Sequence, residues 1–223
     1  MNKAALLAAA SIVALCASGA SAAGMPEVAS SGVVRPLLIP NGAKLLWNQN
    51  SDDAGNYVNS QNYSSSFFNY DDQAADDFVI PKGRTWRITE VDVTGRSYSG
   101  SGPASSENVI FYSDLKGMPG EPVTNGTFSN LNGTRGPSFE LVLPGRGLKL
   151  KAGHYWVSVA ANADYHPYGQ WSWEVSSVQH GDQAMWQNPW GGFGLCEGWE
   201  TLENCFHQGP DLMFDLRGTS RRD

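Results

Sequence analysis

Short hydrophobic segments, alternating or continuous, recur along this chain at intervals of roughly 8 to 15 residues, each bounded by Gly, Pro, Asn or Asp. In one of them Phe139, Leu141 and Leu143 share one parity, as in a strand with one buried face. The expected strands are 44–48, 75–80, 85–94, 108–113, 138–143, 154–160, 170–176, 183–187 and 211–218. No window has a helical period long enough to predict a helix. The pattern predicts an all-β protein, an antiparallel two-sheet sandwich of jelly-roll-like form.

The apolar phase slips within segment 85–94. Trp86 and Ile88 fall on one parity, whereas Val91 and Val93 fall on the other. One extra residue in a strand shifts the phase in this way. We therefore expect a β-bulge near Thr89.

The ends of the chain differ from its centre. Residues 1–22 are typical of a secretory signal peptide, with Lys3, an apolar run and an Ala-Ser-Ala cleavage site. A lipoprotein signal ending at Cys16 is the alternative, although Leu15 stands where a small residue is expected. Residues 23–42 form a flexible leader or first edge strand, 43–218 a single β-sandwich domain, and 219–223 a polar tail.

Several sequence pieces occur in a familiar order. They are ADDFVIP (75–81), WRITEV (86–91), VIFYSD (109–114), GMPG (117–120) and LKLKAGHYWVSV (148–159). In this order the chain resembles secreted bacterial β-sandwich ectodomains of the kind that often carry sorting or surface-anchor tails. The resemblance spans about residues 47–217 and implies a jelly-roll-like sandwich but no catalytic residue. No anchor follows it here, so surface display is not expected.

Charge limits the partners. Removing Lys3 with the signal leaves 15 − 1 = 14 basic against 22 acidic residues, a net charge of −8. Nucleic acid and anionic membranes would require a basic patch and are not expected as partners. No second apolar run approaches the roughly 20 residues of a membrane helix. We expect a secreted or periplasmic protein without a membrane span.

Two cysteines remain after the signal, Cys196 and Cys205. In an oxidising compartment a disulfide between them is expected, with two free thiols as the alternative. A bridge over so short a loop would hold Trp199 and Glu200 between its ends. In the chain-entropy model it stabilises the fold by about 2–3 kcal/mol.

Five of the eight tryptophans lie between residues 165 and 207. Trp171, Trp173 and Val175 share one face of segment 170–176, which either points into the core or forms an exposed platform on which sugar rings stack. The expected ligand-binding residues are Trp171, Trp190 and Trp199 for stacking, Gln170 and Asn188 for hydrogen bonds, and Tyr168 at the rim.

The acidic run at residues 71–77 is the candidate metal site. Asp72, Asp76 and Asp77 offer the hard oxygen ligands that calcium prefers, although an acidic loop is commonly only a solvated surface. The four histidines show no pair at i, i+4, so the sequence does not predict zinc. It indicates no other cofactor.

Three functions follow from these features. The leading hypothesis is a secreted, non-catalytic module that binds a polysaccharide or another extracellular polymer through its Trp-rich surface. The second is a hydrolase of glycosides or peptides in which Glu174 and Glu197 form a carboxylate pair. The third is a structural or adhesive envelope protein with buried tryptophans and no small-molecule site.

Overall fold

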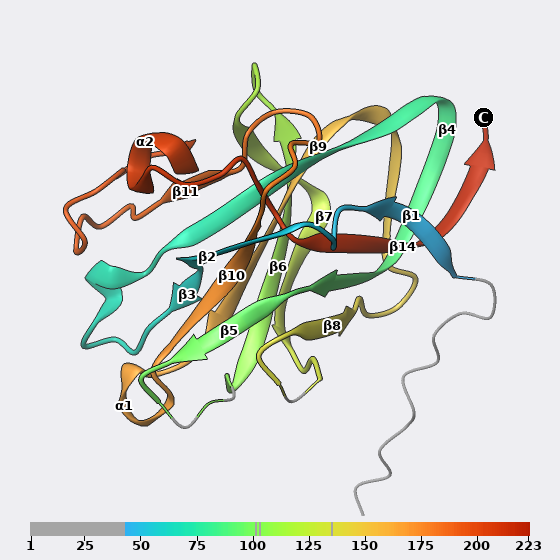
Figure 1. Ribbon diagram of the computed structural model, residues 1–223. Helices are drawn as coiled ribbons and strands as arrows, with labels where there is room; N and C mark the ends of the chain where they lie inside the picture. Colours follow the sequence, from blue (N-terminus) through green and yellow to red (C-terminus); the bar gives the residue numbers. More distant parts are fainter. Residues whose placement is uncertain (1–42, 101, 103, 135) are drawn as a thin grey trace, which may run out of the picture. The chain divides into compact units, whose positions relative to one another are not determined.

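Two β-sheets packed together make up the part of the chain that the structure, a computed structural model, describes: residues 43–100, 102, 104–134 and 136–223 (Figure 1). The predicted all-β sandwich is confirmed. The expected signal segment and leader lie outside the described residues. None of the described helices is long and apolar enough to cross a membrane.

The larger sheet has ten strands. Its central path runs β1 (Lys44–Asn48), β14 (Phe214–Arg222), β4 (Gln73–Val93), β9 (Leu148–Asn162), β6 (Ser106–Asp114) and β7 (Pro119–Leu131). Beside this path, β8 (Phe139–Val142) and β11 (Met185–Gln187) pair with β4, β12 (Glu200–Thr201) pairs with β11, and β3 (Gln61–Asn62) pairs with β9. All these pairs are antiparallel except β3 with β9.

The smaller sheet has four strands arranged around β10 (Gln170–Ser176). Its other members are β13 (Asp211–Leu212), β2 (Asp53–Asn59) and β5 (Gly95–Tyr98). Within the described residues, helical structure is limited to one 3₁₀ turn and two short helices, namely η1 (Phe68–Tyr70), α1 (Tyr165–Tyr168) and α2 (Leu202–Phe206). The connections of this loop-rich sandwich therefore carry most of the residues that can form a site.

Strand β4 joins two of the predicted segments into one long strand. The bulge expected near Thr89 is confirmed, because Arg217 pairs with Glu90 whereas the next residue of β14, Gly218, pairs with Ile88. The extra residue rotates the strand, so Ile88 and Val91 both face the main core despite their opposite parity.

The aromatic face of β10 points inward. Trp171, Trp173 and Val175 are all buried in the main core, which settles the choice between core and platform in favour of the core. Ser172 and Ser176, on the opposite face, are buried as well. Because β2, β5 and β13 flank this strand, β10 is an interior element of the molecule.

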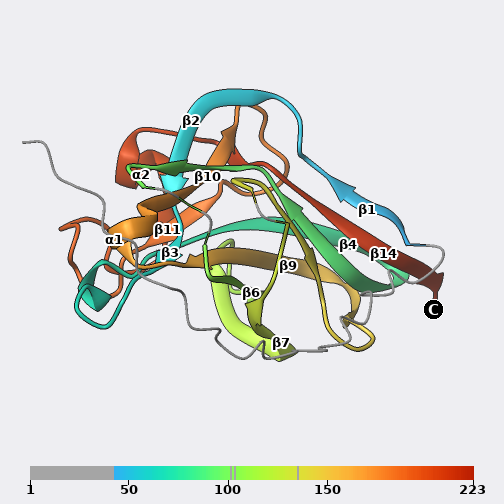
Figure 2. The same cartoon turned by 90° about the horizontal axis from the view of Figure 1, so that it is seen from below.

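The C-terminal strand is longer than the sequence indicated. Strand β14 continues to Arg222, which pairs with Arg84 of β4. Residues 219–222 therefore belong to the large sheet and are not a separate polar tail, because backbone pairing continues although the side chains are polar. The loop that contains η1, the loop after β11, and α1 lie at the opposite end of the sandwich from the C-terminus in both views (Figures 1 and 2).

Candidate functional site

A cavity of about 250 Å³ opens at that end of the sandwich. We call it the aromatic pocket. Its lining residues are Tyr63, Phe67, Tyr70, Tyr165, Gln170 and Phe193. They come from the loop between β3 and β4, from α1, from the start of β10 and from the loop after β11. Three connections that are far apart in the sequence thus contribute to one site.

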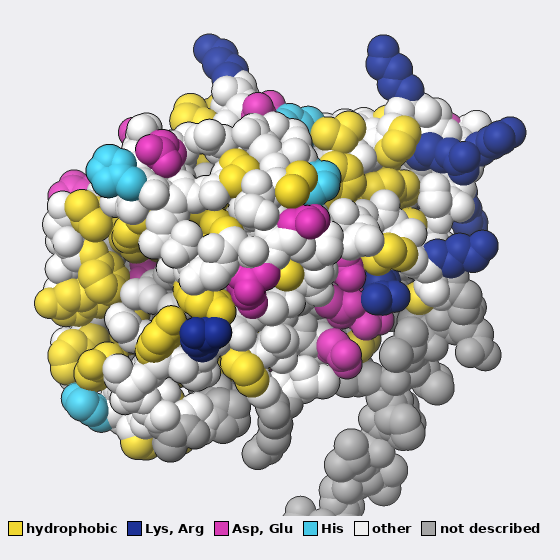
Figure 3. Space-filling view, in the orientation of Figure 1, with side chains coloured by type: hydrophobic (Ala, Val, Ile, Leu, Met, Phe, Trp, Pro, Cys, Tyr) yellow, Lys and Arg dark blue, Asp and Glu magenta, His cyan; other side chains and the backbone are white. Residues whose placement is uncertain are grey.

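The rings of the pocket support one another. Tyr70 meets Phe193 edge to face with their ring centroids 5.2 Å apart, and Phe67 lies 6.5 Å from Tyr70. At the rim, Phe68 and Trp190 also meet edge to face at 5.7 Å, and they are 51% and 63% exposed. Figure 3 shows hydrophobic side chains gathered at this end of the molecule. Aromatic surface is therefore available both inside the pocket and beside it.

The polar groups of the pocket are the Gln170 amide and the hydroxyls of Tyr63, Tyr70 and Tyr165. The Gln170 Nε2 atom donates a hydrogen bond to the Tyr63 hydroxyl oxygen over 3.0 Å. Burial raises the pKa of Tyr63 above its ordinary value, and the nearby Asp72 carboxylate raises it further. The hydroxyl therefore keeps its proton at any physiological pH, and that proton can be donated to a ligand.

Two aspartates hold the loop that carries Tyr63 and Tyr70. Asp71 Oδ1 accepts a hydrogen bond from the Tyr63 backbone N–H at 2.6 Å, and Asp72 Oδ1 accepts one from the Gln61 N–H at 2.8 Å. Burial raises the pKa of the Asp72 carboxyl well above its ordinary value, while the hydrogen bond from Gln61 opposes this shift. These carboxylates fix the backbone beneath the pocket.

Asn188 connects the two loops that carry the pocket's rings. Its amide nitrogen, Nδ2, donates hydrogen bonds to the carbonyl oxygens of Asn69 and Asp71, and its Oδ1 atom accepts one from the Phe193 N–H. Asn188 is 0% exposed, so it cannot hydrogen-bond a ligand. The expectation that it contacts a ligand is therefore wrong. Asn188 instead positions the pocket by using its whole amide within the protein.

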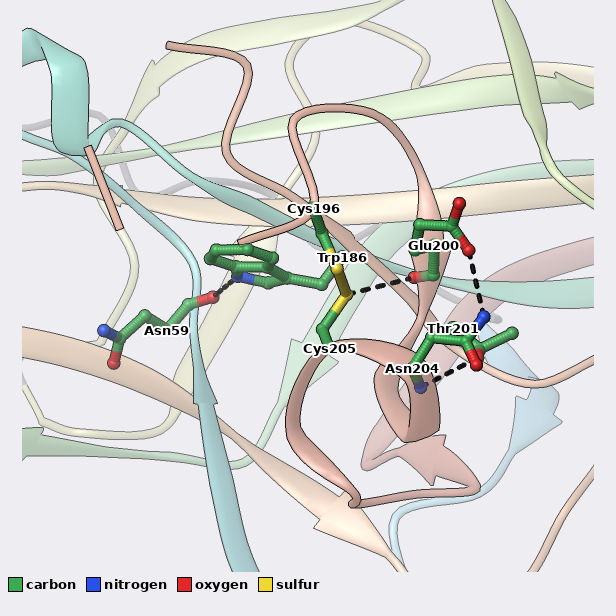
Figure 4. Close-up of a disulfide and its surroundings, with 7 residues drawn as sticks. All are labelled: Asn59, Trp186, Cys196, Glu200, Thr201, Asn204 and Cys205. Atoms are coloured by element: carbon green, nitrogen blue, oxygen red, sulfur yellow. Dashed lines mark hydrogen bonds between the residues drawn. A yellow bond between two sulfur atoms is a disulfide. The ribbon is translucent and has the colours of Figure 1, made fainter. Parts of the chain in front are cut away.

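The predicted disulfide is confirmed. Cys196 and Cys205 are bonded, with their Cα atoms 6.0 Å apart. The bond joins the loop after β11 to α2, where Thr201 caps the helix by accepting a hydrogen bond from the Asn204 N–H (Figure 4). Nearby, the Trp186 indole donates to the Asn59 carbonyl. Both ends of the loop that carries Phe193 are thus anchored to the sandwich.

The predicted stacking residues do not form one surface. Trp171 is only 3% exposed, stacks on Phe139 and donates its indole N–H to the Pro137 carbonyl, so it cannot stack on a ligand. Trp199 is half-buried and packs edge to face on Tyr112 of β6, away from the lining of the pocket. Of the three tryptophans, Trp190 is the one that belongs to a loop of the pocket; it contacts Phe68, next to the lining residue Phe67, and does not itself line the cavity.

Tyr168 and Gln170 lie where a ligand can reach them. Gln170 lines the aromatic pocket, and Tyr168 lines a neighbouring cavity of about 340 Å³ together with Asn62, Asn162 and Tyr63. Tyr63 borders both cavities. The two cavities are therefore neighbours that share a wall.

The predicted calcium ligands are not brought together. Asp72 holds the loop below the pocket, whereas Asp76 Oδ2 accepts hydrogen bonds from Gln49 Nε2 and the Leu212 N–H, both at 2.6 Å. Asp77 is adjacent to Asp76 in β4, so its side chain points to the other face of the sheet. All three side chains are buried, and these residues do not form the expected calcium site.

The carboxylate pair of the hydrolase hypothesis is also separated. Glu174 lies on the small sheet, where it accepts a hydrogen bond from Tyr57, and burial followed by its interaction with Asp53 raises its pKa. Glu197 is exposed in the disulfide-bonded loop beside Gly191. Neither residue lines the aromatic pocket, and the structure gives no contact between these two described side chains.

Sequence reasoning missed most of the pocket. Tyr63, Phe67, Tyr70 and Phe193 were not among the expected ligand-binding residues, because that prediction rested on the clustered tryptophans and these residues are tyrosines and phenylalanines. The available signal was the run Phe67-Phe68-Asn69-Tyr70, three aromatic residues in four, directly before the acidic run. Exposed rings in a short loop are typical of binding surfaces.

Comparison of the chain with protein-family models, with curated proteins and with solved structures found no match. The function must therefore be argued from the geometry of the site itself.

Proposed function

We propose that this protein is a secreted, non-catalytic module that binds a carbohydrate, or another extracellular polymer with ring-shaped units, in the aromatic pocket. The observation that carries the proposal is the composition of the pocket wall. Five aromatic rings, one of them that of Tyr63, line the cavity together with the Gln170 amide, which hydrogen-bonds the Tyr63 hydroxyl. Such a wall provides apolar faces together with a small number of directional hydrogen bonds, as ligand sites generally do.

A sugar ring matches this wall. Its C–H faces are apolar and pack against aromatic rings, while its hydroxyl groups lie at the edge and exchange hydrogen bonds with an amide or a phenol. The cavity of about 250 Å³ lies at the small end of the range for ligand pockets. We expect it to hold one ring-sized unit.

The pocket favours an uncharged ligand. None of its six lining residues carries a charge at neutral pH. Asp71 and Asp72 lie beneath the pocket, but each directs an oxygen to a backbone N–H and not into the cavity. A strongly anionic polymer would find no cation in the lining with which to pair.

The neighbouring cavity favours a polymer over a free monosaccharide. It shares Tyr63 with the aromatic pocket and is lined by Asn62 and Tyr168 as well, whereas the Asn162 amide is engaged by hydrogen bonds within the protein. Trp190 and Phe68 add exposed rings at the rim. A chain with one unit in the pocket would have further stacking and hydrogen-bonding positions beside it.

Binding of the purified, oxidised protein to an array of neutral and charged polysaccharides tests the proposal, with affinities then measured by calorimetry. Tyr63→Phe removes only the phenolic oxygen that Gln170 contacts, so we expect about a tenfold loss of affinity. Trp190→Ala removes the exposed ring and should weaken binding by a similar factor. Both variants should melt within a few degrees of the wild type.

Matched controls come from the other exposed apolar side chains. Tyr98→Phe removes a phenolic oxygen from β5, and Leu115→Ala removes a side chain that is 55% exposed and lies outside the pocket lining. Both should bind as the wild type does. Absence of binding to every polysaccharide, or equal losses in test and control variants, would instead favour a structural envelope protein.

A further inference from the structure

The outer face of the large sheet carries a second, smaller cluster. Along β4, Ala74 and Phe78 face the main core, whereas Ala75 faces the opposite side, and there it packs with Tyr112, Trp156 and Met185. Asp77 follows Ala75 by two residues and therefore lies on this outer face as well. Polar side chains from three other segments meet it there.

His154 of β9 stands at the centre of this group. Its Nε2 atom lies 2.5 Å from Oδ2 of Asp77 and forms a hydrogen bond with it. Its other ring nitrogen, Nδ1, lies 3.4 Å from Asp114 Oδ1 and 4.0 Å from Asp182 Oδ2. One imidazole thus contacts a carboxylate on one side and faces two more on the other.

The two nitrogens of His154 are in different situations. With Nε2 donating its proton to Asp77, the neutral ring presents an unprotonated Nδ1 to the gap between Asp114 and Asp182. Neither of these approaches forms a hydrogen bond in the described structure, since the one formed by His154 is with Asp77. A nitrogen lone pair and two carboxylate oxygens that converge in this way are the donor set of a cation.

Neighbouring residues hold the ligands in place. Asp114 Oδ1 accepts hydrogen bonds from the Trp156 indole and from the Gly117 N–H, both at 3.1 Å. The ring of Trp156 stacks on that of His154, with centroids 5.9 Å apart. Asp114 and His154 are therefore fixed by packing and hydrogen bonds that do not involve an ion.

Asp77 is the independent observation that points to an ion. It is completely buried, is aimed at the imidazole, and its Oδ1 atom has no hydrogen-bond partner. Burying a carboxylate behind a histidine is costly. Histidines that bind a metal almost always donate their second ring N–H to a carboxylate, which fixes the tautomer and makes the ligating nitrogen more basic.

The distances leave room for an ion. The ligand atoms of Asp114, His154 and Asp182 all lie within 4.8 Å of one another. Tetrahedral ligands about 2.1 Å from an ion are separated by roughly 3.4 Å, so the site has to contract slightly. The side chain of Asp182 is 49% exposed and can make that movement by changing its rotamer.

The donor set selects the kind of ion. One imidazole nitrogen with two carboxylate oxygens suits zinc and similar divalent transition metals, whereas calcium takes six to eight oxygens and seldom a nitrogen. Three protein ligands leave a coordination position for water. Both cysteines are in the disulfide and do not compete for the ion.

We propose that Asp114, His154 and Asp182 form a binding site for a divalent transition-metal ion of the Zn²⁺ type, with Asp77 as the residue that positions His154. The site is separate from the aromatic pocket, and the proposal does not depend on polymer binding.

Zinc binding to the oxidised, chelator-treated protein tests the site, with affinity measured by competition against a chromogenic chelator. We expect one Zn²⁺ per chain. His154→Gln should lower the affinity at least 100-fold, and Asp182→Asn at least tenfold. The second variant changes an exposed side chain, so a loss there cannot be attributed to unfolding. His207→Gln, at a side chain that is 89% exposed, is the matched control and should bind as the wild type does.

Asp77→Asn tests the positioning role separately. We expect a 10- to 100-fold lower affinity with the same one-to-one stoichiometry. Co²⁺ provides a second readout, because its visible absorption depends on the ligand geometry and should change in Asp77→Asn but not in His207→Gln. An unchanged affinity and spectrum would overturn the role of Asp77.

Three results would overturn the site itself. The first is equal zinc affinity in the wild type and in both His154→Gln and Asp182→Asn. The second is a wild type that binds Ca²⁺ as tightly as Zn²⁺, because an imidazole ligand favours Zn²⁺ over Ca²⁺. The third is absence of measurable Zn²⁺ binding to the wild type.

Discussion

The aromatic pocket and the His154 cluster use similar residues in opposite ways. Beside the pocket, Asp71 and Asp72 each direct one oxygen to a backbone N–H, and the rings of the pocket lining leave surface free for a ligand. In the His154 cluster the ring surface is occupied, with Trp156 stacked on the imidazole, and polar atoms face a gap. The availability of a group, and not its type, therefore decides which ligand it can take.

The acidic run shows how this difference arises. Asp72, Asp76 and Asp77 are close in the sequence and all buried, yet the first holds a loop and the second accepts hydrogen bonds from Gln49 and Leu212. Strand alternation in β4 directs only Asp77 to the outer face, where His154 lies. Neighbours in sequence are therefore divided between different tasks.

The largest expected effect comes from Asn188→Ala, which should damage one region and spare the other. The change removes three part-buried hydrogen bonds to the backbone of the pocket loops. Leaving those backbone groups unsatisfied should lower the free energy of unfolding by about 3 kcal/mol. We expect polymer binding to be lost while Zn²⁺ binding persists. Urea unfolding and the two binding assays measure this.

Asn204→Ala is the control for that change, because Asn204 is exposed and its side chain contacts only Glu200. Its stability should stay within about 0.5 kcal/mol of the wild type. If Asn188→Ala abolished polymer binding without any loss of stability, Asn188 would be a direct ligand contact. If Zn²⁺ binding disappeared as well, the two regions would not be independent.

The sheet elements could be predicted because they depend on local patterns. The strand at Lys44–Asn48, the strand at Gln170–Ser176 and the bulge at Thr89 follow from alternation and its phase. Strand β2 (Asp53–Asn59) was missed because its sequence, DAGNYVN, contains little hydrophobic alternation. It forms by pairing with β10, an interaction that no local pattern records.

The sites were harder to predict because their residues come from separate connections. Tyr63, Tyr165 and Phe193 meet only after the two sheets have packed, and His154 reaches Asp182 across 28 positions of sequence. Spacing rules for metal ligands apply to residues on one helix or loop and do not detect such a set. The disulfide was predictable because its two cysteines are the only pair outside the segment expected to be a signal peptide.

The second prediction concerns the pH dependence of stability that arises from Glu90, which belongs neither to the aromatic pocket nor to the His154 cluster. Burial, followed by repulsion from Asp92, raises the pKa of Glu90 to about 7, although the charge of Arg217 opposes the shift. The native state therefore binds a proton that the unfolded chain has released. The contribution of Glu90 to stability should be fully present below about pH 4.5 and should be lost as the pH rises through about 7, by at most about 1.4 kcal/mol per pH unit.

Glu90→Gln replaces the titrating carboxyl by an amide that does not titrate. We expect its unfolding free energy to depend less on pH between 4.5 and 7 and to exceed that of the wild type at pH 8, measured by urea titration with a chelator present. The exposed Glu121 provides the control, and Glu121→Gln should follow the wild-type curve. An unchanged slope in Glu90→Gln would show that other buried carboxyls, such as Asp211, dominate.

The smallest expected effect is that of salt on polymer affinity, and a near-constant affinity is the predicted result. The lining of the aromatic pocket carries no charge, so binding there depends on apolar contact and neutral hydrogen bonds, which salt does not screen. Raising NaCl from about 50 to 500 mM should change the polymer affinity less than twofold. Zn²⁺ affinity should fall several-fold over the same range, because Asp182 is half exposed and its attraction for the ion is screened. Calorimetry on one preparation of protein measures both.

A steep salt dependence of polymer binding would mean that charged residues outside the lining take part and that the ligand is an anionic or cationic polymer. The contrast between an uncharged aromatic pocket and a cluster of carboxylates would then no longer hold.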